Sequence, residues 1–296
     1  MEQVTRAGAL NDQGKFRTAI ELIEPVLFSN AHGSNDALIG VAWNIRGLAF
    51  QALGDLDKAR RSYEAAIGIL RGVPAQETQL ASALDNLGSL NAELGQLEES
   101  KSLRIRAKQL FESLSDHSGV ARILSNLALV AIAQGNRKEA RHNLAGAFYE
   151  ESFVPVPDVG DLAAMYSTQC LEDEREGDFR AGLAAINRAI QLWTEHYGSD
   201  YYLLAAGYSL RGRAYGGLRD YQNALHDLQH SLLLLKENSE EGSRVYLLTE
   251  LSYAQVLRDS GMKREASQTE SEARSALEGL RHRRCDARTI SAESLR

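Results

Sequence analysis

Hydrophobic residues recur at helical spacing along most of the chain, in pairs of segments separated by a short polar break. In residues 43–53, Trp43, Gly47 and Phe50 fall on one face of a helix, because they are spaced at i, i+4 and i+7. In residues 56–67, Ala59 and Tyr63 share a face in the same way. A helix buries such an apolar stripe against a neighbouring element. The pattern therefore predicts two helices that pack on each other as a hairpin.

The break between these two segments is Gly54-Asp55. Glycine adopts the left-handed conformation that commonly ends a helix, and aspartate caps the first turn of the next one. Gly47 needs a different explanation, because glycine inside a helix costs roughly 0.5–1 kcal/mol relative to alanine. We expect close packing against Gly47 to leave no room for a side chain.

The hairpin pattern repeats seven times. The small residue at position 47 recurs at intervals of 40, 41, 40, 42, 42 and 42 residues, as Ala7, Gly47, Gly88, Ala128, Cys170, Gly212 and Ala254. A second small residue follows twelve positions later in every unit, as Ala19, Ala59, Ser100, Ala140, Gly182, Ala224 and Ala266. Repeats of this length indicate stacked supersecondary units. The predicted units are residues 1–35, 36–76, 77–116, 117–155, 156–198, 199–240 and 241–280, followed by a basic C-terminal tail at 281–296.

The motif Trp43-x-x-Arg46-Gly47-x-x-Phe50, followed by Ala59-x-x-x-Tyr63, resembles the tetratricopeptide repeat. The period near 42 resembles the extended repeats of kinesin light chains and of bacterial proteins similar to them. The resemblance covers residues 1 to about 280. It implies an all-α, right-handed superhelical solenoid of about seven helix hairpins. The sequence departs from the consensus where leucine is usual, since Arg46, Gln169 and Arg211 occupy that position.

In the family that the chain resembles, the first helix of each hairpin lines the concave face of the solenoid. The resemblance therefore implies a set of partner-binding side chains two and three residues before each small residue, and one, four and five after it. The candidates at these positions are Asn44, Gln51, Asp85, Asn86, Ser89, Glu93, Ser125, Asn126, Leu129, Ser167, Thr168, Glu174, Arg175, Ser209, Arg213, Ser252, Gln255 and Arg258, and Arg122 joins them from one turn earlier in the fourth unit.

Asparagine recurs near one register of this lining, at Asn44, Asn86 and Asn126. An amide side chain carries both hydrogen-bond donors and acceptors. Such a row of amides can pair with the backbone of an extended peptide, or it can join neighbouring helices to one another. The sequence leaves both interpretations open.

Candidate chemistry elsewhere in the sequence is weak. His226 and His230 share a helix face, but no third metal ligand accompanies them, so a surface pair is the better interpretation. Cys170 occupies a small core position, which favours an inert packed thiol. Cys285 lies in the basic tail with Arg281, Arg283, Arg284 and Arg288. We predict no catalytic residues, no metal site and no cofactor.

Charge and composition narrow the class of partner. The net charge is -7, whereas binding to nucleic acid favours a basic face. No run of about 18 apolar residues is present to insert into a membrane. The N-terminal residues do not resemble a leader, which favours the cytoplasm, with the periplasm or secretion left open if a leader was removed. We predict a noncovalent scaffold or adaptor that binds a protein or an extended peptide. The alternative is a peptide-sensing module that regulates a partner protein, and enzyme activity is not expected.

Overall fold

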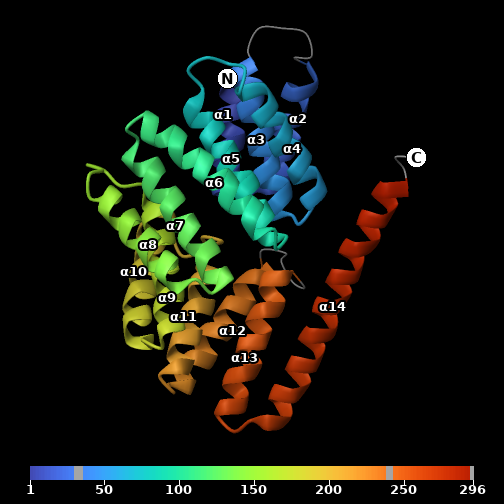
Figure 1. Cartoon of the computed structure of the whole chain (residues 1–296). Helices are drawn as coiled ribbons and strands as arrows, with labels where there is room; N and C mark the ends of the chain where they lie inside the picture. The colour runs from blue at the N-terminus through green and yellow to red at the C-terminus, as the bar shows by residue number, and fades with distance from the viewer. Residues whose placement is uncertain (30–35, 238–242, 294–296) are drawn as a thin grey trace. The chain divides into compact units, whose positions relative to one another are not determined.

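The structure is a computed structural model that describes the backbone of residues 1–29, 36–237 and 243–293. Side chains are described within these ranges up to Gly279, apart from Ser29. Figure 1 shows the helices that fill these residues, among which there is no strand. The helices are α1 (Glu2–Asp12), α2 (Phe16–Ser29), α3 (Asp36–Ala52), α4 (Leu56–Leu70), α5 (Glu77–Glu93), α6 (Leu97–Ser113), α7 (His117–Gln134), α8 (Arg137–Glu151), α9 (Val159–Glu176), α10 (Phe179–Tyr197), α11 (Leu204–Gly217), α12 (Tyr221–Glu237), α13 (Arg244–Asp259) and α14 (Lys263–Glu293).

The fourteen helices of the described ranges form seven consecutive hairpins, which confirms the predicted all-α class and the number of repeats. The chain divides into two compact units, Met1–Thr168 and Gln169–Arg296, and the division falls inside α9. Unit 1 contains α1 to α8 and the first part of α9. Unit 2 contains the rest of α9 and α10 to α14. The finer boundaries predicted for the seven repeats stay predictions, and the side chains of the basic tail lie outside the described residues.

Each hairpin turns at the residue predicted from the sequence. The position seven residues after the small residue, which is Gly54 in the second hairpin, adopts a positive φ between 62° and 97° in all seven hairpins, at Gly14, Gly54, Gly95, Gly135, Gly177, Arg219 and Gly261. Arginine takes this left-handed conformation in the sixth hairpin, where a side chain makes it unfavourable. Asp55 then caps α4, because its Oδ1 accepts a hydrogen bond from the Lys58 backbone N–H at 3.1 Å. The same cap recurs at Asn136 and Asp178.

The small residues lie where the two helices of a hairpin cross. Gly47 is buried, and a Cβ built there would meet the Tyr63 ring at 2.5 Å. A Cβ at Gly212 would likewise meet Leu228 at 2.7 Å. The alanines at this register, among them Ala7 and Ala128, are fully buried. Close contact between helices therefore explains the small residues, as the sequence predicts.

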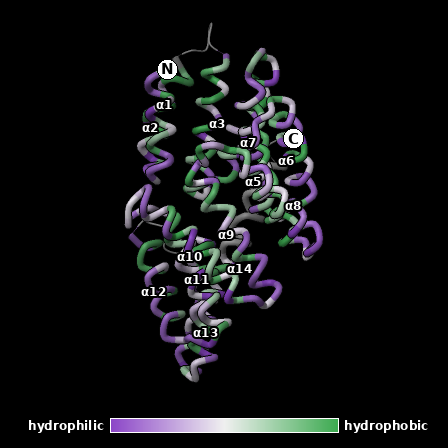
Figure 2. Tube along the Cα trace, turned by 90° about the vertical axis from the view of Figure 1, so that its left-hand side faces the viewer, coloured by the Kyte–Doolittle hydropathy of each residue, from purple (hydrophilic) through white to green (hydrophobic). Residues whose placement is uncertain are grey.

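Figure 2 shows hydrophobic and hydrophilic residues intermixed along the helices. The core of unit 1 includes the fully buried side chains Tyr63, Leu84 and Phe111, and that of unit 2 includes Ile186 and Leu228. Within the described ranges, none of the helices combines the length and the hydrophobicity needed to cross a membrane.

Candidate functional site

The predicted row of amides forms hydrogen bonds between first helices of successive hairpins. The Asn86 side chain on α5 donates through Nδ2 to Asn44 Oδ1 on α3, at 3.0 Å. One repeat further, Asn126 Nδ2 on α7 donates to both carboxylate oxygens of Asp85 on α5, at 3.0 and 3.1 Å. We call the row of side-chain hydrogen bonds Asn44–Asn86, Asp85–Asn126 and Ser125–Thr168 the polar ladder.

The ladder has a fixed register in unit 1. The residue three positions before the small residue bonds to the residue two positions before it in the next repeat. Asn44 with Asn86 and Asp85 with Asn126 follow this rule, and so does Ser125, whose Oγ donates to Thr168 Oγ1 at 3.2 Å. The rule thus joins α3, α5, α7 and α9 in order.

Two further contacts join the same helices beside the ladder. Gln51 Nε2 donates to Glu93 Oε2 at 3.3 Å, and its Oε1 accepts from the Tyr63 hydroxyl at 2.8 Å. Arg122 Nη1 donates to Asp161 Oδ2 at 3.3 Å. The predicted lining residues of unit 1 are therefore brought together, largely in pairs from neighbouring repeats.

Arg104 on α6 is a residue that the sequence analysis missed. It is 3% exposed, and its Nε donates to Asp85 Oδ1 at 3.1 Å. Its Nη2 also donates to Ser89 Oγ at 2.9 Å, and its Nη1 donates to the backbone carbonyl oxygen of Asn126 at 3.2 Å. A signal for it was available, since Arg104 stands four residues after Ser100, where the second and sixth repeats carry Tyr63 and Leu228.

Three of the predicted lining residues are buried rather than open to a partner: Asp85, Ser125 and Thr168 are 5%, 3% and 2% exposed. The reason is that their hydrogen-bond partners come from the adjacent helices. Asn44, Asn86 and Asn126 are half-buried and line one side of α3, α5 and α7. The Asn86–Asn44 bond uses one donor and one acceptor of the four hydrogen-bonding groups that the two amides carry, so the pair retains capacity for another ligand.

The remaining predicted lining residues are more dispersed. Ser167 donates to the Ala163 carbonyl of its own helix, and Gln255 donates to Asp259 on α13. In unit 2, Arg213 on α11 forms an ion pair with Glu174 on α9. With Arg175 and Phe179 they line a cavity of ≈ 240 Å³.

The two arginines that depart from the consensus have partners inside their own hairpins. Arg46 donates to Ser62 Oγ at 2.9 Å and lies over the Phe50 ring at 4.6 Å. Arg211 donates through Nε and Nη2 to the two carboxylate oxygens of Asp227, at 2.6 and 2.9 Å. Each of these arginines therefore meets a polar residue that stands sixteen positions later in the same hairpin.

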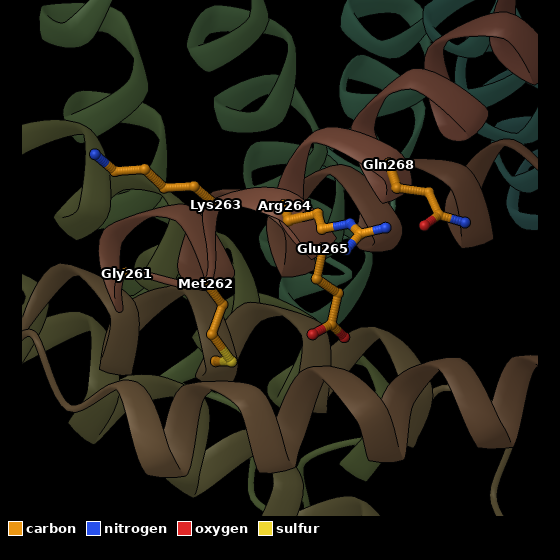
Figure 3. Close-up of a pocket in the computed structure, with 6 residues that line it drawn as sticks. All are labelled: Gly261, Met262, Lys263, Arg264, Glu265 and Gln268. Carbon is orange, nitrogen blue, oxygen red and sulfur yellow. The ribbon is translucent and has the colours of Figure 1, made fainter.

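A cavity lies where α13 turns into α14 (Figure 3). It has a volume of ≈ 630 Å³ and is lined by Gly261, Met262, Lys263, Arg264, Glu265 and Gln268. Figure 3 shows Lys263 and Gln268 pointing to opposite sides and Glu265 pointing away from both. Side chains that diverge in this way do not converge on one ligand atom.

The other residues with potential chemistry lie apart from the ladder. The rings of His226 and His230 are 6.4 Å apart, and the described residues contain no cluster of three metal-ligating side chains. Cys170 is fully buried, and burial raises the pKa of its thiol to about 12. A thiol with that pKa stays protonated and is a poor nucleophile. Cys285 lies outside the residues whose side chains are described.

Two segments match models that are both described as tetratricopeptide repeat, at residues 41–69 and 79–147. In addition, 90 residues are 37% identical to part of G-protein-signaling modulator 1 of Rattus norvegicus. That alignment covers 28% of this chain and 13% of the rat protein, so the chain spans only a small part of that relative.

The fold is similar to those of two solved structures. Aspartyl phosphate phosphatase F from Bacillus subtilis is 13% identical, with a TM-score of 0.68 over 93% of this chain and 69% of that one. A Rap protein complexed with Competence and Sporulation Factor is 10% identical, with a TM-score of 0.63 over 95% of this chain and 98% of that one. At these identities the likeness concerns the fold alone. Over residues 41–69 and 79–147, however, the sequence itself matches the tetratricopeptide repeat.

Proposed function

We propose that this chain is a noncovalent scaffold or adaptor that binds a protein or an extended peptide along the polar ladder. Tetratricopeptide repeat domains typically bind proteins. The observation that carries the proposal is the half-buried row Asn44, Asn86 and Asn126, which repeats once per hairpin across α3, α5 and α7. An extended backbone presents donors and acceptors along its length, and a row of amides can pair with it.

The ladder serves two purposes in this proposal. Its bonds hold neighbouring first helices in register, and the groups that those bonds leave over contact the ligand. Both interpretations of the amides thus apply to the same residues, because each amide has more hydrogen-bonding groups than the helix contact uses. We further propose that the remaining exposed lining residues, such as Arg213 and Gln255, contact more distant parts of a partner.

A second candidate is a peptide-sensing module that regulates a partner protein. It is favoured by the likeness to a Rap protein solved with Competence and Sporulation Factor, which is a likeness of fold. Membership of the long-period, kinesin-light-chain-like subfamily, as found in bacteria, is also a proposal, and it rests on the spacing of 40–42 residues.

The test begins with linear peptides selected from a random library on the immobilised full chain. Their affinity is then measured by fluorescence anisotropy for the wild type and for the double variant Asn44→Ala/Asn86→Ala. This variant removes both partners of one hydrogen bond, so it leaves no unpaired group and should fold normally. The matched control is Gln109→Ala/Gln222→Ala, two exposed amides on second helices.

We expect the Asn44→Ala/Asn86→Ala variant to bind the selected peptides about tenfold more weakly, equivalent to 1.4 kcal/mol, and the control to bind them as the wild type does. Equal affinity in both variants would refute the proposal. A selected peptide that binds and also changes the affinity of the chain for a second protein would favour the sensing module over the passive scaffold.

A further inference from the structure

The carboxylate of Glu151 is buried without a hydrogen-bond donor. Glu151 is the last residue of α8 and is 6% exposed. Neither of its side-chain oxygens has a hydrogen-bond partner among the described residues. Burying a carboxylate without a hydrogen-bond donor or a cation costs free energy, because the hydrogen bonds that it loses to water are not replaced by others in the protein. This glutamate therefore calls for an explanation beyond the packing of the hairpin.

Other carboxylates of unit 1 lie near enough to Glu151 to repel its negative charge. Burial raises the pKa of Glu151, and the nearby Asp161 and Asp158 raise it further. Asp158 stands before α9 and caps that helix, because its Oδ1 accepts from the Asp161 backbone N–H at 2.9 Å. Burial and then Asp158 also raise the pKa of Asp12, at the end of α1. We call Glu151, Asp158, Asp161 and Asp12 the acidic cluster.

The cations in reach are already committed to other carboxylates. Arg122 lies 3.3 Å from Asp161 and 3.9 Å from Asp85, so it is shared between the two. Arg104 is buried against Asp85. Two guanidinium groups thus balance Asp85 and Asp161. Within the described residues, Glu151, Asp158 and Asp12 have no ion pair with a cation.

We propose that the acidic cluster receives a cationic side chain of the bound partner, a lysine ammonium or an arginine guanidinium. Asp158 and Asp12 are exposed, whereas Glu151 is buried. An ammonium or guanidinium supplies the donors that Glu151 lacks and pairs with the charge of its neighbours. An organic cation fits better than a metal ion, because the described residues hold no group of three ligands with metal-binding geometry.

This inference rests on the proposed function and adds the chemistry of the ligand. The ladder leads to the cluster, since Arg122 on α7 joins Asp85 on α5 to Asp161 on α9. A peptide that follows Asn44, Asn86 and Asn126 along the first helices therefore reaches the cluster at the α9 end. A basic residue at that end of the peptide is the feature that the cluster selects.

The experiment uses the full chain and two fluorescein-labelled probes, octalysine and octaglutamate, with anisotropy measured at near-physiological ionic strength. The test variant is Glu151→Gln/Asp158→Asn. Asparagine caps a helix as well as aspartate does, so α9 keeps its first turn. The control is Glu64→Gln/Glu99→Gln, which removes the same charge from exposed positions on α4 and α6. This control is needed because a net charge of -7 attracts any polycation.

We expect the wild type and the control to bind octalysine within about twofold of each other, and the test variant to bind it about tenfold more weakly. Octaglutamate should not bind. The inference is overturned if octalysine fails to bind the wild type, or if test and control variants weaken binding equally. Should Glu151→Gln impair folding, the single variant Asp158→Asn, compared with Glu64→Gln alone, decides the question by the same criterion.

The two proposals fail separately. Library-selected peptides that depend on Asn44 and Asn86, but bind the Glu151→Gln/Asp158→Asn variant normally, would keep the scaffold function and overturn the cation site. The opposite result is octalysine binding that depends on the acidic cluster, together with selected peptides whose affinity does not depend on the polar ladder. That result would keep the cation site and overturn the proposed binding of a peptide along the ladder.

Discussion

Replacing Gly47 by alanine tests whether close packing between paired helices explains the repeated small residue. A Cβ at this position would lie 2.5 Å from Tyr63 Cε1 and 2.6 Å from Cδ1. Ordinary carbon–carbon contacts are about 3.5–4.0 Å, so the ring must move by about 1 Å. Tyr63 is fully buried, and its hydroxyl donates to Gln51 Oε1 at 2.8 Å. The ring therefore cannot swing into solvent, and the backbone must give way.

The magnitude follows from two opposing effects. Overpacking a well-packed core costs about 1–3 kcal/mol. Alanine is a better helix former than glycine by about 0.5–1 kcal/mol. The free energy of unfolding of the Gly47→Ala variant should therefore be about 1–2 kcal/mol lower than that of the wild type. Gly68 on α4 is the matched control, since a Cβ there meets nothing within 4 Å. The Gly68→Ala variant should be more stable than the wild type by about 0.5–1 kcal/mol, because only the better helix propensity of alanine applies there.

The assay is urea unfolding followed by tryptophan fluorescence. The chain has two tryptophans, Trp43 in unit 1 and Trp193 in unit 2. A Trp193→Phe background leaves Trp43 as the reporter, so the signal reflects the unit that contains Gly47. Adding Tyr63→Leu tests the contact itself, because the smaller side chain should remove part of the penalty of Gly47→Ala. The packing explanation would be refuted if Gly47→Ala were as stable as Gly68→Ala.

Three further predictions concern turns, the ladder and pH. Arg219→Gly should stabilise unit 2 by about 0.5–1 kcal/mol, measured by urea unfolding through Trp193, because glycine adopts φ of 62° without the strain of a side chain; no gain would contradict this account of the turn. Asn126→Ala should lower the free energy of unfolding by about 1–3 kcal/mol, measured in the same assay through Trp43, because it removes two hydrogen bonds donated to the buried Asp85 carboxylate. A loss no larger than that of Asn44→Ala/Asn86→Ala would contradict this reasoning. Burial, then Asp178 and Glu172, raise the pKa of Asp173 from 3.8 to about 6. The folded state therefore binds this proton more tightly than the unfolded state does. The stability of unit 2 should accordingly fall as the pH rises from about 4 to 6. Asp173→Asn should reduce that fall, and an unchanged pH profile would exclude Asp173 as its cause.

The fold followed from the sequence because its signals are local and repeated. The left-handed turn at Gly54 and the small residue at Gly47 report backbone geometry and helix contact directly. Each recurs in all seven hairpins, so a single departure such as Arg219 does not obscure the pattern. The structure adds that the backbone keeps its left-handed conformation there even without glycine.

The candidate site was less predictable because its bonds join residues 39 to 43 positions apart. The sequence indicated which residues lie on the first helices, but an amide donates equally well to a ligand and to a neighbouring helix. Burial of Asp85 depended on Arg104, which comes from a second helix. The unpartnered Glu151 carried no sequence signal at all, since a glutamate at the end of a helix is usually solvated.

The register of the ladder has a consequence for how the array can change its length. Losing the third repeat would remove Asp85 and Arg104 together, and Asn44 would then face Asn126, again an amide opposite an amide. Losing the fourth repeat would instead place Asp85 opposite Thr168, and Arg122 would be gone. Of these two repeats, the third is therefore the one that deletion during evolution could remove while Asp161 keeps its partner Arg122.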